Sequence, residues 1–238
     1  MHREHVRWYS PRLERNMDLL VFGHAGARVI VFPSSMGKFF EWEDQGMIQA
    51  LREHLERGWI QLYCVDSVDS DSWYAKWKHP ADRARHHARY DAYLRDEVFP
   101  LTQQNGNPFL MTTGASFGAY QAMTFALRYP HLVSRVIGLS GIYDIREITD
   151  GYTDENVYPF NPAEFIVNEH DPERLAALSR MDIIVAIGRD DSMRGNSEYF
   201  SGRLWSRNIW HALRIWDGWA HDWPYWRQMI ATYIAGSD

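Results

Sequence analysis

Short apolar runs alternate with amphipathic segments along most of the chain, which is the pattern of strands alternating with helices. The first three runs are separated by Pro11 and by a turn at residues 23–26, as in strands joined by tight connections. The run 60–65 is continuously apolar, which indicates a strand covered on both faces. The pattern predicts strands at Val6–Ser10, Met17–Phe22, Arg28–Phe32, Ile60–Val65, Phe109–Thr113, Arg135–Leu139, Ile183–Ile187 and His211–Trp216.

Segments with helical periodicity lie between these strands. Alternating strands and helices form right-handed βαβ units, so we expect a three-layer α/β fold with a mostly parallel central sheet and antiparallel strands at its N-terminal edge. Residues 142–180 interrupt the rhythm with three prolines and little periodicity, and they are predicted to form a small cap-like insertion after the sixth strand. The predicted helices are Met47–Arg57, Ala81–Leu101, Phe117–Arg128, Ser197–Ser206 and Pro224–Ile234.

Composition narrows the class of protein. A chain of 238 residues with 45% hydrophobic and 24% charged residues fits a single globular domain over 1–238. The net charge of -6 argues against a nucleic-acid partner, which usually requires a basic surface. Cys64 is the only cysteine, and neither the N-terminus nor any later stretch has the apolar length of a membrane span. We therefore expect a soluble cytoplasmic protein without a membrane partner, and the oligomeric state stays open.

Residues 114–118, Gly-Ala-Ser-Phe-Gly, match the pattern G-x-S-x-G in an informative context. The motif directly follows the strand Phe109–Thr113 and opens the helix Phe117–Arg128. So tight a strand-to-helix turn strains the backbone of the serine, and the flanking glycines remove side chains that would clash. The positive end of the helix dipole favours negative charge developing nearby. We predict Ser116 as a catalytic nucleophile; the alternative is a Gly-Ser turn without a catalytic role.

A histidine and an acid are expected after this serine, at the carboxyl ends of later strands. In serine hydrolases whose nucleophile lies on a strand-to-helix turn, the catalytic residues occur along the chain in the order Ser, Asp or Glu, His. His221 follows the last predicted strand, whereas His211 begins that strand and so lies at the opposite end of the sheet. We predict His221 as the general base. The alternative is a structural histidine packed among the neighbouring tryptophans.

The acid is predicted in the segment Gly188-Arg189-Asp190-Asp191, after the strand Ile183–Ile187. Asp191 is favoured because it stands three residues after the glycine, and Asp190 is the alternative. Asp217 and Asp222 are too close to His221 in sequence to be preferred. The acid would hold the imidazole tautomer and stabilise the imidazolium that forms during reaction.

Two backbone amides are candidates for an oxyanion hole. One is the amide of Phe117, directly after the nucleophile; the other comes from the early loop at 34–37, where Ser35 is the first choice and Ser34 the second. The aromatic residues Trp73 and Tyr74 follow the strand Ile60–Val65 and are expected on the same rim. They are candidate substrate-binding residues, although aromatic side chains closing the edge of the core would give the same pattern.

These residues predict a serine hydrolase that cleaves a carboxylic ester through an acyl-enzyme intermediate, without metal or cofactor. Acyl transfer to an alcohol and thioester hydrolysis use the same residues and stay open. A binding module that kept the fold is a non-enzymatic alternative. A metal enzyme using His86-His87 or His221-Asp222 is disfavoured, because the chain lacks a spaced ligand set such as H-E-x-x-H.

The chain also resembles a known group of α/β hydrolases. The segments that carry the resemblance are FPSSMGKFFEWEDQGM, YCVDSVDSDSWY, TTGASFGAYQAMTFALRYP, LSGIYDI and WDGWAHDWPYWRQM, which cover most of the chain in order. They are similar to the esterase group that includes esterase D (S-formylglutathione hydrolase), feruloyl esterases and the antigen 85 mycolyltransferases, and most of all to bacterial proteins known only as esterase family proteins. The resemblance implies catalytic Ser116 and His221, with an oxyanion donor from the early loop, and it leaves the acid between Asp190 and Asp191.

Overall fold

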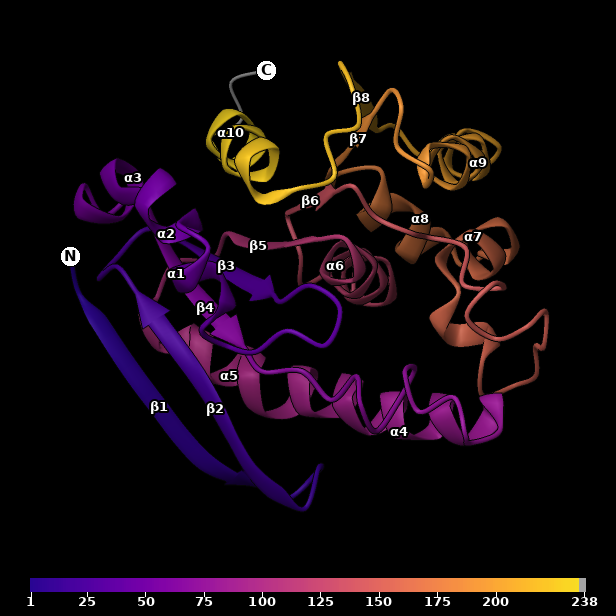
Figure 1. Cartoon of the computed structure of the whole chain (residues 1–238), viewed down its shortest axis with the longest axis horizontal. Helices are drawn as coiled ribbons and strands as arrows, with labels where there is room; N and C mark the ends of the chain where they lie inside the picture. Colours follow the sequence, from indigo (N-terminus) through magenta and orange to yellow (C-terminus); the bar gives the residue numbers. More distant parts are fainter. Residues whose placement is uncertain (236–238) are drawn as a thin grey trace.

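The computed structural model describes residues 1–235 and contains one eight-stranded sheet (Figure 1). The strands lie in the order β1-β2-β4-β3-β5-β6-β7-β8. β1 and β2 are antiparallel to their neighbours, and all pairs from β4 to β8 are parallel. The strand bounds are β1 (Arg3–Ser10), β2 (Arg15–Phe22), β3 (Ala27–Phe32), β4 (Ile60–Val65), β5 (Leu110–Ala115), β6 (Arg135–Leu139), β7 (Asp182–Gly188) and β8 (Ala212–Trp216). The predicted mostly parallel sheet with an antiparallel N-terminal edge is confirmed.

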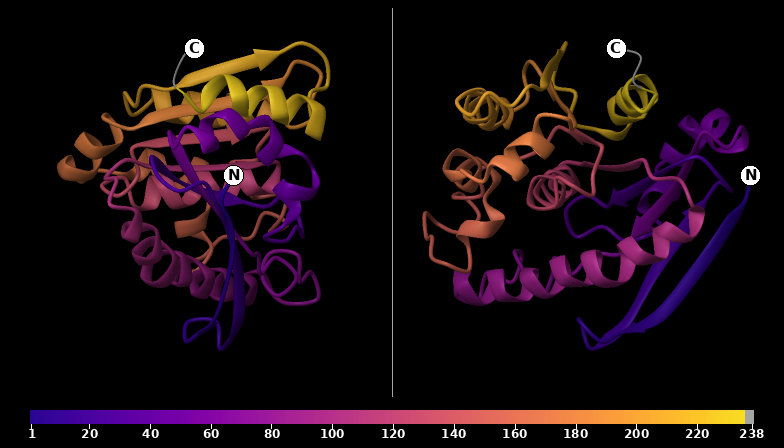
Figure 2. Two further views of the ribbon diagram at one scale, coloured as in Figure 1. Left: turned by 90° about the vertical axis from the view of Figure 1, so that its left-hand side faces the viewer. Right: turned by 180° about the vertical axis from the view of Figure 1, so that it is seen from behind.

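Helices cover both faces of the sheet (Figures 1 and 2). Their bounds are α1 (Glu41–Asp44), α2 (Met47–Ala50), α3 (Arg52–Glu56), α4 (Pro80–Tyr93), α5 (Phe99–Thr102), α6 (Phe117–Arg128), α7 (Pro162–Phe165), α8 (Pro172–Leu178), α9 (Arg194–Trp205) and α10 (Trp223–Tyr233). One face is covered by α1–α3 and α10, and the other by α4 and α6–α9. A π-helical turn at Leu94–Val98 continues α4 into α5, so the long predicted helix is nearly unbroken.

Apolar side chains along each strand point alternately to the two faces of the sheet, so the structure has two separate hydrophobic cores. In β3, Val29 and Val31 pack under α1–α3 and α10, whereas Ile30 and Phe32 pack under α4 and α6. The β1–β2 hairpin extends beyond the other strands (Figure 2), since β2 pairs with β4 only over Leu19–Phe22. The three-layer α/β architecture is therefore the one that the hydrophobic pattern predicts.

The differences from the predicted elements are local. The helix predicted at 47–57 is divided at Leu51, whose backbone leaves the helical range with a ψ of 9°. The stretch predicted as a cap-like insertion after β6 contains two short α-helices, α7 and α8, each with a proline at its first turn, and two single 3-10 turns at Tyr158–Phe160 and Ile166–Asn168. No helix within residues 1–235 combines the length and the apolar character needed to cross a bilayer.

A third hydrophobic cluster, which includes Trp73, Phe117, Tyr120 and Phe160, fills the space between α4, α6 and the insertion. Within it, His87 on α4 is buried against the rings of Trp73 and Phe160, with centroid separations of 5.3 and 4.8 Å. Burial lowers the pKa of His87 to about 3, and the nearby Arg128 adds to the effect. The imidazole is therefore neutral in the native protein at neutral pH.

This neutral histidine should make stability depend on pH. Below pH 6.5 the unfolded chain binds a proton at His87 that the native state does not bind until about pH 3, so the free energy of unfolding decreases as the pH falls through this interval. Between pH 7 and pH 4 the wild-type protein is expected to lose about 3 kcal/mol more stability than His87→Phe. Urea unfolding of both proteins at the two pH values measures the difference, and equal losses would contradict the assignment.

Candidate active site

Ser116 occupies the sharp turn between β5 and α6. Its backbone has a φ of +54° and a ψ of -120°, a conformation that residues with a side chain rarely adopt, and its N–H donates to the Leu139 carbonyl at 2.8 Å. The flanking glycines make the turn possible. A Cβ at Gly114 would collide with the Gly118 carbonyl group, and a Cβ at Gly118 would collide with the carbonyl oxygen of Pro33.

His221 follows β8 in a loop that is anchored to the end of β6. Ala220 has a φ of +47°, and its carbonyl accepts a hydrogen bond from Ser140 Oγ at 3.0 Å. Trp226 Nε1–H donates to the same hydroxyl at 3.0 Å, and the Trp226 ring packs edge-on against the imidazole at 5.3 Å. Ser140 and Trp226 thus hold the histidine from behind.

The structure brings Ser116, His221 and Asp191 into one chain of contacts. His221 Nε2 lies 3.2 Å from Ser116 Oγ, and His221 Nδ1 lies 2.7 Å from Asp191 Oδ2. The Asp191 side chain is fully buried, and its other oxygen accepts a hydrogen bond from the Met193 N–H at 2.9 Å. This arrangement orients one imidazole nitrogen toward the serine and the other toward a carboxylate.

The other candidate acids do not reach the imidazole. The side chain of Asp190 is exposed, and its backbone N–H donates to the Gly218 carbonyl at 3.0 Å. Asp217 is 95% exposed at its side chain and pairs with Arg189, while Asp222 caps α10 through the Trp223 N–H. Of these four aspartates, only Asp191 forms a hydrogen bond with the His221 imidazole.

The two candidate oxyanion donors lie on the same pocket as the serine. Phe117 is the first residue of α6, so its N–H has no partner within the helix. Ser35 lines the pocket, and its Oγ accepts a hydrogen bond from the Tyr74 hydroxyl at 2.7 Å. Ser34, the second choice, is wrong as a donor because its N–H is already bound to the Glu41 carboxylate at 2.7 Å.

A pocket of about 330 Å³ opens above Ser116. Hydroxyl groups and apolar side chains dominate its wall, and His221 and Tyr74 are the titratable residues that line it. Burial raises the pKa of Tyr74 above its usual value, so its hydroxyl stays protonated and can donate to Ser35. The lining residues are Ser35, Tyr74, Ser116, Phe117, Ser140, Ile142, Ile148, Ser192, Met193, Trp219 and His221.

Trp73 does not line this pocket, contrary to the expectation from its position. Its side chain has no exposed surface and packs in the third hydrophobic cluster, against His87. The neighbouring residue, Tyr74, faces the pocket because the chain turns after β4: the Tyr74 N–H donates back to the Asp69 carbonyl at 3.0 Å. Of the two aromatic candidates, only Tyr74 can contact a ligand here.

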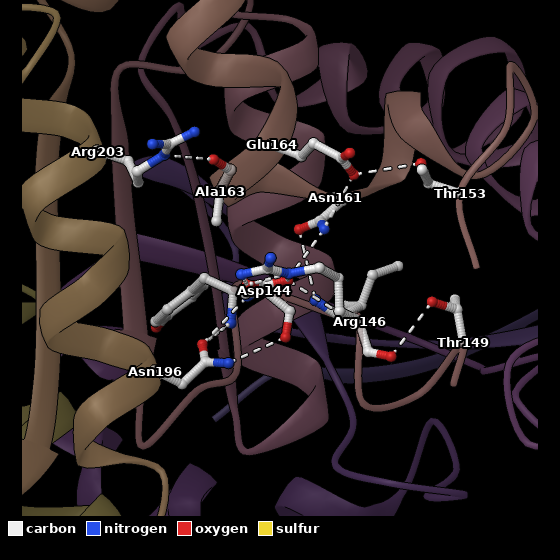
Figure 3. A network of polar contacts seen from close by, with 11 residues as sticks. Asp144, Arg146, Thr149, Thr153, Asn161, Ala163, Glu164, Asn196 and Arg203 are labelled. Atoms are coloured by element: carbon white, nitrogen blue, oxygen red, sulfur yellow. Dashed lines mark hydrogen bonds and ion pairs between the residues drawn. The ribbon is translucent and has the colours of Figure 1, made fainter. Parts of the chain in front are cut away.

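The segment after β6 forms one wall of the pocket through Ile142 and Ile148. Figure 3 shows the polar network that holds this segment: Asn196 on α9 accepts hydrogen bonds from the backbone N–H groups of Tyr143 and Asp144 and donates to the Asp144 carbonyl. Asp144 also accepts a hydrogen bond from Asn161 at 3.1 Å. The insertion is therefore fastened to the α/β body beside the pocket.

Sequence reasoning missed several residues of this site. Ser140, Ile142 and Met193 were not predicted, although the first two lie within three residues of the end of β6 and Met193 lies in the turn between β7 and α9, where ligand sites of parallel sheets form. Ser140 is the clearest case, because it is the first residue after β6 and has a φ of +51°. Among residues 1–235, no three His, Cys, Asp or Glu side chains are grouped so that they could hold a metal ion.

The sheet order, the strained serine turn and the loops that meet above it define a protein of the α/β-hydrolase fold. A family model described as "Putative esterase" matches residues 41–235, and the chain belongs to this family. Family membership supports the hydrolysis of esters. A search of curated protein sequences finds no match.

Solved structures of esterases share the fold at low sequence identity. A ferulic acid esterase is 15% identical, covers 98% of this chain and 96% of its own, and has a TM-score of 0.77. An S-formylglutathione hydrolase from Agrobacterium tumefaciens is 15% identical, with coverages of 98% and 93% and a TM-score of 0.77. A ferulic acid esterase from Anaeromyces mucronatus, in complex with ferulic acid, is 14% identical, with coverages of 99% and 90% and a TM-score of 0.72.

Proposed function

We propose that the protein is a serine hydrolase that cleaves a carboxylic ester through an acyl-enzyme intermediate. The observation that carries the proposal is the line of contacts from Ser116 Oγ through His221 to the buried Asp191, at 3.2 and 2.7 Å. One eight-stranded sheet positions all three residues, which supports a single catalytic domain. Family membership supports the ester as the bond that is cleaved.

In the first half of the reaction, Ser116 Oγ attacks the ester carbonyl and His221 Nε2 takes the hydroxyl proton. The carbonyl oxygen gains negative charge as the tetrahedral intermediate forms. The N–H groups of Phe117 and Ser35 stabilise that charge, and the start of α6 adds a favourable dipole. The imidazolium then donates its proton to the leaving alcohol, and the acyl group stays on Ser116.

In the second half, a water molecule takes the place of the alcohol. His221 removes a proton from the water as the water attacks the acyl-enzyme. The imidazolium then returns the proton to Ser116 Oγ as the acyl–oxygen bond breaks, and the free acid leaves. Asp191 accepts a hydrogen bond from Nδ1–H throughout, so Nε2 of the neutral imidazole carries the lone pair that takes the proton first from Ser116 and later from water.

The substrate is proposed to be a small ester with an uncharged acyl group. The wall contributed by Ile142, Ile148 and Met193 is apolar, and a charged acyl group would lose its hydration there without gaining an ionic partner. The ferulic acid complex of a structural neighbour supports a small-molecule ester of this kind. Thioester hydrolysis and acyl transfer to an alcohol use the same chemistry and remain alternatives.

Activity on a series of p-nitrophenyl esters tests the proposal, together with labelling by a phosphonofluoridate probe that reacts with activated serines. The wild-type protein is expected to hydrolyse short acyl esters and to take up one probe molecule. A folded protein that does neither would contradict the proposed function.

Adjacent aspartates allow a matched test of the acid. Asp191→Ala is expected to lower kcat by about 10⁴-fold, because His221 loses the carboxylate that holds its tautomer. Asp190→Ala changes an exposed side chain one position away and is expected to stay within about twofold of the wild type. Steady-state kinetics of both variants decide between the two aspartates, and the reverse order of effects would reassign the acid.

A further inference from the structure

The loop at residues 34–37, between β3 and α1, is held on both sides of Ser35. On one side, the N–H and the hydroxyl of Ser34 both donate to the Glu41 carboxylate at 2.7 Å. On the other side, the Met36 N–H donates to Asp69 Oδ2 at 3.0 Å, and Met36 has a φ of +59°. Two carboxylates thus bind the amides that flank Ser35, the residue that lines the pocket.

Asp69 also contacts the helix that carries the other oxyanion donor. Its side chain is 1% exposed, and Oδ1 accepts a hydrogen bond from Gln121 Nε2 at 2.9 Å. Gln121 lies on α6, one helical turn after Phe117. A single buried carboxylate therefore joins the neighbour of Ser35 to the helix that begins at Phe117.

Steric contact prevents the early loop and the start of α6 from moving closer together. A side chain at Gly118 would collide with the carbonyl oxygen of Pro33, so the start of α6 and the loop already lie as close as their backbones allow. Contact at Gly118 prevents the two segments from moving together, and the hydrogen bonds of Asp69 prevent them from moving apart.

We propose that Asp69 is a positioning residue that sets the separation between the two oxyanion donors, Ser35 N–H and Phe117 N–H. The inference rests on the proposed hydrolysis at Ser116. Asp69 touches neither the substrate nor the reacting atoms, and it acts through Met36 and Gln121. Its effect should appear in the transition state, where the charge on the carbonyl oxygen develops.

A carboxyl group is an unfavourable choice at this position for stability alone. Burial raises the pKa of Asp69 to about 7, which the hydrogen bonds from Met36 and Gln121 only partly offset. The other charged or titratable groups near it are Lys38 from the segment after the early loop, Glu41 from α1, Tyr74 from its own turn and Tyr90 from α4. Lys38 is the one cation among these groups, and its charge does not offset the cost of burying the Asp69 carboxyl group. We therefore attribute the carboxyl group at this position to the positioning of the two donors.

Removing the side chain should slow catalysis without weakening substrate binding. Asp69→Ala is expected to lower kcat by about 100-fold with KM within about threefold of the wild type, because a misplaced donor is lost mainly in the transition state. Inhibition by a trifluoromethyl ketone, whose adduct with the serine carries an oxyanion, should weaken in proportion to kcat/KM. Affinity for an ether analogue of the ester, which has no carbonyl oxygen to place between the two donors, should not change.

Asp69→Asn provides a conservative rescue. Gln121 Oε1 is buried without a hydrogen-bond partner among the described residues, so rotation of the Gln121 amide would let it accept from the new Asn side chain. The asparagine oxygen would still accept from the Met36 N–H. This variant is expected to keep kcat within about fivefold of the wild type, whereas Gln121→Ala should lower kcat by about tenfold. Asp69→Ala/Gln121→Ala should be no slower than Asp69→Ala alone.

Asp91→Asn is the matched control, because Asp91 is a similarly buried carboxylate on α4 that binds Arg128 and Tyr129 away from the pocket. It should lower Tm without changing kcat. If Asp69→Ala lowers Tm but keeps the wild-type kcat and inhibitor affinity, Asp69 has only a structural role. If that variant does not fold, an unchanged kcat in Gln121→Ala overturns the proposal. A wild-type protein without esterase activity would instead contradict the proposed function itself.

Discussion

Replacing Ser116 with alanine is expected to lower kcat by about 10⁶-fold and to abolish labelling by a phosphonofluoridate. The variant keeps the pocket and the oxyanion donors but loses the oxygen that forms the acyl-enzyme. The strained backbone at Ser116 should tolerate alanine, because Gly114 and Gly118 still make room for the turn. Circular dichroism and Tm measurements should match the wild type, so loss of activity reports on the chemistry.

A second serine–histidine pair in the chain provides the control. Ser201 Oγ lies 2.6 Å from His211 Nε2, but both residues are buried and neither lines the pocket. Ser201→Ala is therefore expected to keep both turnover and labelling. Labelling that persists in Ser116→Ala would show that the nucleophile is a different residue.

Replacing His221 with alanine is expected to lower kcat by a similar factor of about 10⁶, because the serine and the histidine act as a unit. The expected labelling by the phosphonofluoridate differs from that of Ser116→Ala. Ser116 is still present, so the phosphonofluoridate should react very slowly but should still modify one site per molecule. Mass spectrometry over a long time course, together with steady-state kinetics, distinguishes the two variants.

His211→Gln is the corresponding control for the histidine. His211 donates from Nδ1 to the Ile209 carbonyl, which leaves Nε2 to accept from Ser201, so this pair resembles the Ser116–His221 pair in its local hydrogen bonding. Its replacement should affect stability but not kcat of the folded protein. If His221→Ala retains substantial turnover, or if His211→Gln abolishes it, His221 is not the general base.

Local sequence patterns were sufficient for much of the fold. The predicted bounds of α6 and β6 agree with the structure, because each element is a single periodic run with clear limits: the serine turn and Tyr129 for α6, and a short apolar run for β6. The nearly continuous helix from Pro80 to Thr102 was also predicted within two residues at each end. The insertion after β6 could be recognised only as a break in the rhythm, since its short helices bury few residues.

The sequence by itself determined that Ser116 lies in a strand-to-helix turn and that a histidine and an aspartate follow later strands, because motif, order and periodicity are properties of the chain. Only the tertiary structure decided which aspartate contacts the imidazole, that Trp73 is buried while Tyr74 faces the pocket, and that Asp69 reaches both the early loop and α6. Adjacent residues in a turn point in different directions, and the backbone angles that decide between them depend on contacts with distant loops. Asp190 is turned away by its bond to Gly218, which is such a contact.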